Sequence, residues 1–275
     1  MRRSYFSDRN PNFSTIRLRV PLGIIYPEQL DTLKGVAQRY GRDRIHLTVR
    51  KTVEIPGIST SDVPAALEEL ARAGWYSSSF GNNLRNVVAC PGLYSCPNAL
   101  VDTAALGLEL DSAFADCDDF PAKVKIAIAG CPNACSHPLI NDIGVVGVSR
   151  VEIDHERCTG CGSCKQACRE DAIELRADKA YINYDRCIDC GDCARECGED
   201  SAINQKVGYR IYIGGKMGRH PRFAEPIADL LTQAQALRLI ESLLLLLCAQ
   251  GKPDERLANL VDRLTLEGIK KQLGL

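Results

Sequence analysis

The chain has 275 residues, enough for one large domain or for two to three small ones. Its 34 Lys and Arg residues nearly balance its 35 Asp and Glu residues, which argues against a general nucleic-acid-binding protein, because such a protein needs an excess of positive charge. The longest apolar run, residues 243–249, is far shorter than the roughly 20 residues that span a bilayer, so we expect no membrane span.

The N-terminal residues include a pair of arginines, Arg2 and Arg3, that superficially resembles a twin-arginine export signal. Polar residues follow in place of the apolar segment that such a signal needs, so we interpret this stretch as a polar arm. We therefore expect a cytoplasmic protein, in which a reducing environment keeps cysteine side chains available as thiolates.

Residues 1–77 contain no cysteine and alternate between strand and helix patterns. Apolar and polar side chains alternate over 16–20 and again over 45–51, which predicts two strands. Apolar residues recur on one face of 27–40, which begins at a proline, and 62–73 is a second helical segment. This order of elements predicts a ferredoxin-like α+β domain.

The rest of the chain predicts an α+β body with an insertion. A helix is expected near 97–110, beginning at Pro97. The predicted strands are 84–89, 123–129, 143–148 and 209–213, and the predicted C-terminal helices are about 226–250 and 254–267. The expected domains are 1–77, then 78–150 together with 206–275, and an inserted module over 151–205.

Cysteine is the outlier of the composition, with 14 residues. Two of them, Cys117 and Cys248, stand alone and are expected to be buried, inert thiols. Eight others form an internal repeat, in which each cysteine of the first set recurs 29 residues later in the second. The two sets are Cys158, Cys161, Cys164 and Cys168, followed by Cys187, Cys190, Cys193 and Cys197.

The C-x2-C-x2-C-x3-C spacing of each set is that of two-cluster bacterial ferredoxins, in which the fourth cysteine binds the other cluster. On that pattern, one 4Fe–4S cluster has the ligands Cys158, Cys161, Cys164 and Cys197, and the other has Cys187, Cys190, Cys193 and Cys168. Zinc sites are the alternative, but they use paired C-x2-C motifs. The module predicts electron transfer.

A further group of cysteines, Cys90, Cys96, Cys131 and Cys135, has the pattern C-x5-C…C-x3-C. By itself this pattern allows a third cluster, a zinc site or buried thiols. Lys123 and Lys125 share one face of the strand that runs into this group, because side chains alternate along a strand.

A second cationic face is expected where the strands 16–20 and 45–51 share a sheet. Its members are Arg17, Arg19, His46, Thr48 and Arg50. Each strand alone could be a half-solvated strand with polar residues outward. Both faces, however, have only cationic or neutral polar groups in a chain of net charge −1, which favours a polyanionic ligand.

These motifs, together with Leu84-Arg85-Asn86-Val87 and His46-Leu-Thr-Val-Arg50, resemble the sulfite and nitrite reductases that use sirohaem coupled to a 4Fe–4S cluster. With a two-cluster ferredoxin after the C-x3-C motif, the chain is most similar to the C subunit of the anaerobic sulfite reductases, and more distantly to the dissimilatory subunits. The resemblance implies three 4Fe–4S clusters and a sirohaem, with Cys135 shared between the first cluster and the sirohaem iron.

The resemblance also implies roles for basic and polar residues. The sulfite-binding, catalytic residues would be Arg50, Arg85, Lys123 and Lys125. The residues expected at the sirohaem carboxylates are Arg17, Arg19, Thr48, Asn82 and Asn83, and a second contacting loop would comprise Gly214, Gly215, Lys216 and Arg219, unless it is a plain turn.

The function that we expect is the six-electron reduction of sulfite to sulfide. Relatives that reduce nitrite tend to have asparagine at the position of Lys125, so the lysine favours sulfite. The alternatives are a sirohaem nitrite reductase and an electron-transfer subunit without sirohaem. No G-x-G-x-x-G motif is present, so electrons would come from a ferredoxin or from companion flavin- and iron–sulfur-containing subunits. The longer relatives contain two such halves, which implies a homodimer or higher oligomer here.

Overall fold

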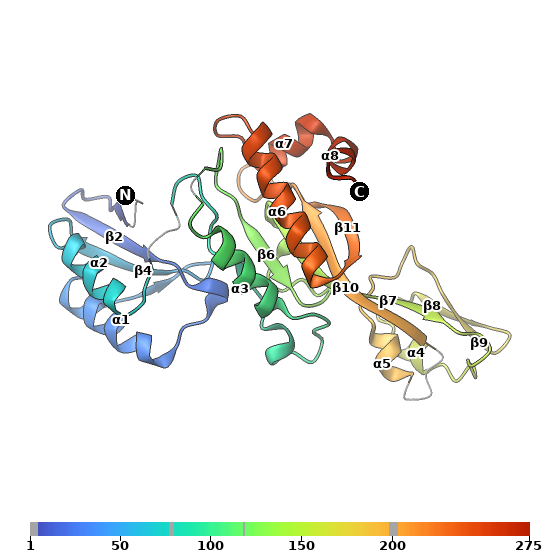
Figure 1. Cartoon of the computed structure of the whole chain (residues 1–275). Coiled ribbons are helices and arrows are strands. Elements are labelled where there is room, and N and C mark those ends of the chain that lie inside the picture. The colour runs from blue at the N-terminus through green and yellow to red at the C-terminus, as the bar shows by residue number, and fades with distance from the viewer. Residues whose placement is uncertain (1–4, 77–79, 118, 198–202) are drawn as a thin grey trace.

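The computed structural model describes residues 5–76, 80–117, 119–197 and 203–275, so Arg2 and Arg3 lie outside the described residues. These described residues form an N-terminal sheet with two helices, a central sheet with four helices, and a cysteine-rich extension (Figure 1). Among the described residues, no helix is both long enough and apolar enough to cross a membrane.

The N-terminal sheet has the strand order β1-β2-β4-β3, and all neighbours are antiparallel. Its core is formed by side chains such as Ile16, Leu18 and Ile55, which are fully buried with apolar residues of both helices. The helices predicted over 27–40 and 62–73 are both present in the structure. The elements are β1 (Tyr5–Ser7), β2 (Phe13–Leu18), α1 (Pro27–Arg39), β3 (His46–Leu47), β4 (Val53–Ser59) and α2 (Val63–Arg72).

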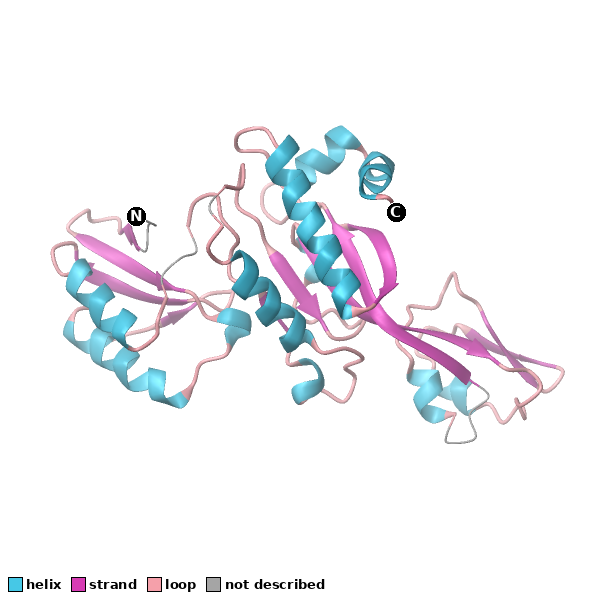
Figure 2. Ribbon diagram, viewed as in Figure 1, coloured by secondary structure: helices cyan, strands magenta, loops and turns pink. Residues whose placement is uncertain are grey.

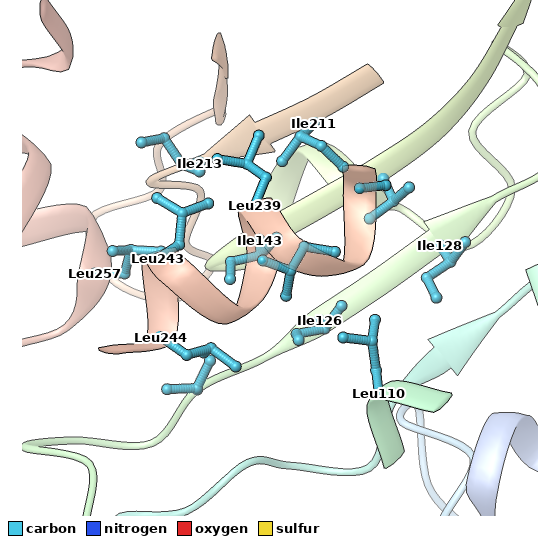
Figure 3. Packing of buried hydrophobic residues seen from close by; sticks show 14 of the residues in the cluster. Leu110, Ile126, Ile128, Ile143, Ile211, Ile213, Leu239, Leu243, Leu244 and Leu257 are labelled. Atoms are coloured by element: carbon cyan, nitrogen blue, oxygen red, sulfur yellow. The ribbon is translucent and has the colours of Figure 1, made fainter. Parts of the chain in front are cut away.

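The central sheet has the strand order β11-β10-β7-β6-β5, with parallel pairing from β5 to β7 and antiparallel pairing from β7 to β11. Leu110 of α3 and Leu243 of α6 pack with Ile126, Ile128 and Ile211 of the strands (Figure 3). The elements are β5 (Val88–Ala89), α3 (Thr103–Phe114), β6 (Ile126–Ala129), β7 (Ile143–Ile153), β10 (Ile203–Ile213), β11 (Glu225–Leu231), α6 (Gln233–Gln250), α7 (Leu257–Leu264) and α8 (Leu266–Leu273).

The cysteine-rich extension is continuous with the central sheet. Strands β7 and β10 pair without interruption from Ile143 opposite Ile213 to Ile153 opposite Ile203, and their far ends reach into the extension (Figure 2). Val151 and Ile203 belong to the extension's own small core, together with Cys164 and Cys193. The remaining elements are α4 (Ser163–Ala167), β8 (Ile173–Arg176), β9 (Lys179–Ile182) and α5 (Asp192–Glu196).

Three secondary-structure predictions are wrong. Strand 45–51 ends at Leu47, because a tight turn follows in which the Lys51 N–H donates to the Thr48 carbonyl at 2.9 Å. The helix expected from Pro97 begins only after Asp102, whose carboxylate accepts hydrogen bonds from the first backbone amides. The predicted helix 226–250 begins only at Gln233, because β11 occupies the residues before it.

Candidate active site

Two adjoining pockets lie where the N-terminal sheet meets the central sheet, and Val49, Arg50 and Lys125 line both. The first has a volume of about 540 Å³, and its lining includes Arg85 and Lys123. The second has a volume of about 670 Å³. Cys90 and Cys135 contribute to its lining, together with apolar residues that include Val88 and Ile140. The structure thus brings the four predicted sulfite-binding residues and two cysteines of the first group to one connected space.

The turn after β3 determines where Arg50 lies. Lys51 has φ +58°, a left-handed conformation that reverses the chain before β4 begins. As a result, the Arg50 guanidinium reaches the central sheet, where it donates hydrogen bonds to Asn141 Oδ1 at 2.7 Å and to the carbonyl of Asn86 at 2.6 Å. An extended strand would have kept Arg50 in the N-terminal sheet.

Arg50 also has an unsatisfied group. Its Nε is buried and has no hydrogen-bond partner among the described residues. Burial lowers the pKa of Arg50 to about 10. A buried N–H donor on a cationic side chain is a strong site for an anion, because leaving it unpaired costs free energy. The chemistry of this donor fits an oxyanion or a carboxylate.

The segment directly before β6, which contains Lys123 and Lys125, is also held in place by hydrogen bonds. The backbone N–H of Lys125 donates to the Asp142 carboxylate at 2.9 Å, and Arg256 pairs with the same fully buried carboxylate. Burial, followed by repulsion from Arg50 and Arg256, lowers the pKa of Lys125 to about 8. This value lies close to neutral pH, which suits a side chain that donates a proton.

Arg85 lies on the neighbouring segment. Its backbone N–H donates to the Val124 carbonyl at 2.8 Å, so this segment runs beside the one that contains Lys123 and Lys125. Burial, followed by repulsion from Arg17 and Arg256, lowers the pKa of Arg85 to about 10. Both arginines stay protonated at neutral pH, and they can therefore supply only charge and hydrogen bonds.

The first cysteine group surrounds the end of β6. Cys90 Sγ accepts a hydrogen bond from the Gly130 N–H at 3.1 Å, directly before Cys131. Burial raises the pKa of Cys131, and repulsion from the nearby thiols of Cys96, Cys90 and Cys135 raises it further. The four predicted ligands thus lie near one another, with Cys135 on the side of the pocket.

Cysteines from the two halves of the repeat lie near one another in the structure. Cys168 lines one small cavity together with Cys187, Cys190 and Cys193. The pKa of Cys164 is raised by burial, and additionally by Cys197, Cys158 and Cys161. Among the described residues, no three His, Cys, Asp or Glu side chains are close enough to hold a single metal ion, so cluster binding stays a prediction.

Several predicted cofactor contacts lie elsewhere. Arg19 does not reach the pockets, because its guanidinium is buried against the Asp111 carboxylate and the Leu84 carbonyl. Asn82 is exposed and donates to the Pro121 carbonyl at 3.0 Å. Asn83 is buried, and neither asparagine belongs to the lining of these two pockets.

The cationic face of the N-terminal sheet is not purely cationic, which corrects a second expectation. Glu54 lies on β4, between β2 and β3, and accepts hydrogen bonds from Arg17 Nε at 2.7 Å and from His46 Nδ1 at 2.9 Å. Arg17 still lines the first pocket, with its guanidinium 4.4 Å from the centre of the Phe80 ring. Thr48 lines the same pocket and bonds to the Thr52 hydroxyl at 2.6 Å.

The glycine-rich loop after β10 contributes differently from the expectation. Gly214 and Gly215 pack against the backbone near Asn141, and Lys216 Nζ bonds to Asn259 Oδ1 at 3.2 Å. Arg219 is exposed, and none of these four predicted contacts lines either pocket. Met217, which was not predicted, is the residue of this loop that lines the second pocket.

The sequence interpretation also missed the polar residues that position Arg50 and Lys125. Asn86 donates from Nδ2 to the Arg50 carbonyl at 2.9 Å, and Asn141 and Asp142 bind the two cationic residues as described above. Asn141 and Asp142 directly precede the apolar run of β7. A polar pair at the start of a buried strand is the signal that could have identified them.

Comparisons with known proteins agree with this architecture. A family model for the nitrite and sulphite reductase 4Fe-4S domain matches residues 80–275, and one for the nitrite/sulfite reductase ferredoxin-like half domain matches residues 7–73. The coenzyme F420-dependent sulfite reductase of Methanocaldococcus jannaschii is 41% identical over 205 residues, which are 74% of this chain and 33% of that protein.

The chain is also similar in sequence to one subunit of an enzyme and similar in fold to a solved structure. The C subunit of the anaerobic sulfite reductase of Salmonella typhimurium is 33% identical over 182 residues, 60% of this chain and 52% of that protein. The chain therefore spans about a third to a half of the length of these two relatives. The crystal structure of dissimilatory sulfite reductase I has a TM-score of 0.77 over 95% of this chain and 69% of that chain, at 20% identity, which shows a common fold.

Proposed function

The chain belongs to the nitrite and sulfite reductase family, and on that premise we propose that it reduces sulfite to sulfide with sirohaem and 4Fe–4S clusters as cofactors. The observation that supports this most strongly is the composition of the connected pockets. Arg50 and Lys125 line the same space as Cys90 and Cys135. An electron-transfer subunit alone has no need for cationic side chains beside its cysteines.

The residues present fit the proposed cofactors. Cys90, Cys96, Cys131 and Cys135 would hold the first cluster, with Cys135 shared with the sirohaem iron. The unpaired buried Nε of Arg50 suits an anionic ligand, and Arg17 and Thr48 remain candidates for sirohaem carboxylates. When bound, these cofactors would pass electrons to the substrate and supply the iron chemistry of the reduction.

The chain's own residues would bind the substrate and supply protons. Arg50 and Arg85 keep their charge and would neutralise the oxyanion, an electrostatic contribution. Lys125, whose pKa is lowered to about 8, would donate protons to the oxygen atoms that leave as water. Lys123 would add a fourth positive charge. The fixed contacts of Arg50 with Asn141 and Asn86 keep its guanidinium in place before substrate binds.

Sulfite is preferred over nitrite in this proposal because of Lys125. The corresponding residue of the nitrite-reducing relatives tends to be asparagine, and sulfite has more negative charge to neutralise. The family itself includes enzymes for both substrates, so a sirohaem nitrite reductase is the second candidate.

Residues 151–205 would form the inserted ferredoxin module that delivers electrons. The crossed cysteine sets support two further 4Fe–4S clusters there, which makes three in total. The electrons would come from a ferredoxin or from companion flavin- and iron–sulfur-containing subunits. We also propose a two-fold dimer, in which basic residues of one protomer contact the sirohaem of the other.

The test is anaerobic purification from a host that makes sirohaem, followed by absorption spectroscopy, iron analysis and assays with sulfite and nitrite. A Soret band, about thirteen irons per chain (twelve in three clusters and one in sirohaem) and sulfite-dependent oxidation of a reduced dye are the expected results. Brown protein with about eight irons and no macrocycle would refute the enzyme and leave the electron-transfer subunit. Faster turnover of nitrite than of sulfite would favour the second candidate.

A further inference from the structure

The two halves of the cysteine repeat differ at several positions, one of which is the residue directly before the second cysteine. The first half has Gly160 between its first two cysteines, and the second half has Asp189 at the corresponding place. Both residues have positive φ, +71° for Gly160 and +58° for Asp189. Glycine adopts this conformation freely, and aspartate does so more readily than most other residues. The two turns therefore share a backbone conformation and differ in the carboxylate that only the second one presents.

The Asp189 carboxylate belongs to a partly buried charge network on the central sheet. The Asp189 side chain is 5% exposed and accepts hydrogen bonds from Arg150 Nε at 2.8 Å and from Arg210 Nη2 at 2.6 Å. Arg150 belongs to β7 and Arg210 to β10. Asp229 of β11 also binds Arg210, at 2.6 Å. Two arginines and two aspartates thus balance in charge.

The backbone of the same loop also rests on the sheet. The Asp189 carbonyl accepts the Ser149 N–H at 2.7 Å. A Cβ atom on Gly191 would lie 2.9 Å from Ser149 Oγ and 3.0 Å from Gln205 Nε2, so these side chains would have to shift, and the φ of +73° at this position also favours glycine. The loop 187–193 is therefore packed directly against β7 and β10.

The residues on either side of Asp189 face the first cysteine group. Ile188 and Cys190 line a cavity of about 40 Å³ together with Cys131 and Asn133. Strand β7 supports both sides of this junction. A Cβ atom on Gly147 would lie 2.4 Å from the Gly130 carbonyl, directly before Cys131, and Ser149 holds Asp189 two residues further on.

We propose that Asp189 is a positioning residue, which anchors the loop 187–193 to β7 and β10 and thereby keeps Cys190 at the cavity that Cys131 also lines. This makes the second half of the repeat the exit of the electron relay, and the set with Cys158 the entrance. The relay rests on the proposed function; the anchoring does not. Each electron that crosses the junction oxidises the donor cluster by one equivalent and reduces the acceptor cluster by one.

The test compares Asp189→Asn and Asp189→Gly with Asp185→Asn in anaerobically prepared, cluster-containing protein. Asp185 is exposed and lies in the same half of the repeat, outside the loop 187–193. Hydrogen exchange of peptides covering 147–153 and 187–193 is the first readout. We expect at least about tenfold faster exchange in both Asp189 variants and unchanged exchange in the control, since hydrogen bonds to charged groups are lost.

The glycine variant separates the anchor from backbone effects. Glycine adopts the positive φ of this position readily. If Asp189 served only the geometry of the loop, hydrogen exchange in Asp189→Gly would be slower or unchanged. That result would overturn the proposal. Arg210→Gln removes the partner from the sheet side and should reproduce the faster exchange, which covers the case in which the Asp189 variants fail to fold.

Electron paramagnetic resonance of the reduced protein is the second readout. Asp189 Oδ1 lies 4.0 Å from Cys187 Sγ, so losing its charge could also change a cluster potential directly. If Asp189 is an anchor, the Asp189 variants should show a weaker magnetic interaction between clusters. A changed cluster potential with unaltered hydrogen exchange and an unaltered magnetic interaction would contradict the proposal. Absence of sulfite reduction by the wild-type protein would refute the proposed function, but the hydrogen-exchange result would remain valid.

Discussion

Replacing Lys125 by methionine should stabilise the protein in the absence of sulfite. The Lys125 side chain is partly buried among cationic groups, and burial, Arg50 and Arg256 together lower its pKa from 10.5 to about 8. A lysine whose pKa is lowered by folding destabilises the folded state in its charged form. Methionine keeps the length of the side chain and removes the charge.

The magnitude follows from the pKa difference between the unfolded and folded chain. Each pKa unit corresponds to about 1.4 kcal/mol, so the difference amounts to roughly 3 kcal/mol for a fully buried group. Lys125 is partly solvated, which reduces the expected gain to about 1–2 kcal/mol. The penalty is complete below about pH 8 and disappears as the pH rises toward 10.5, where the unfolded chain also loses its proton.

Chemical denaturation of anaerobically purified protein at about pH 7 and about pH 9.5 measures this effect. The stability advantage of Lys125→Met should shrink at the higher pH, and adding sulfite should stabilise the wild-type protein more than the variant, because ligand binding stabilises the folded state. Lys34→Met, at an exposed position of α1, controls for the apolar substitution itself. A variant that is less stable at about pH 7 and still responds fully to sulfite would refute this reasoning.

Four further predictions address the substrate, the pH dependence, the fold and the clusters. Lys125→Asn should weaken sulfite reduction and spare or improve nitrite reduction, and unchanged sulfite kinetics in paired assays would remove the substrate argument. Sulfite reduction should fall as the pH rises through about 8, where Lys125 loses its proton, and Lys125→Arg, which cannot donate a proton, should lower the rate and remove that decline from the pH–rate profile. Asp111→Asn should cost about 3 kcal/mol in urea unfolding, because a neutral amide then faces the buried Arg19 guanidinium; an unchanged midpoint would contradict this. Cys187→Ser should lower the iron content by about a third while Cys117→Ser leaves it intact, and equal iron in both variants would exclude Cys187 as a ligand.

Local patterns in the sequence predicted the elements whose environment is periodic. Residues 27–40 follow a helical repeat and start at a proline, and the structure has a helix over Pro27–Arg39. Alternation over 123–129 correctly indicated that Val124, Ile126 and Ile128 are buried while the lysines point elsewhere. These features depend on near neighbours in the chain, which the sequence displays directly.

Errors occurred where contacts between distant segments decide the structure. Residues 45–51 alternate like a strand, yet Val49 is 99% exposed and the chain turns back before β4. Residues 225–231 contain enough Leu and Ile for a helix, but pairing with β10 makes them an edge strand that tolerates Pro226. Strand pairing is a non-local choice that no short window contains.

The candidate site shows the same division. The spacing of Lys123 and Lys125 placed both side chains at the pocket, and family resemblance added Arg50 and Arg85. Arg19 was grouped with them because it alternates with buried residues, but its partner Asp111 lies far away in the sequence. A buried ion pair between distant residues is invisible to local patterns.

The uninterrupted pairing of β7 with β10 has a consequence for how such a chain could have been assembled. The backbone leaves the sheet at Ile153 and returns at Ile203, its direct partner on the adjacent strand. Removing the intervening stretch would leave two ends that an ordinary hairpin turn could join. The tip of this hairpin is therefore a natural point for gaining, losing or exchanging a small domain, and a shortened chain closed by such a turn should still fold its central sheet.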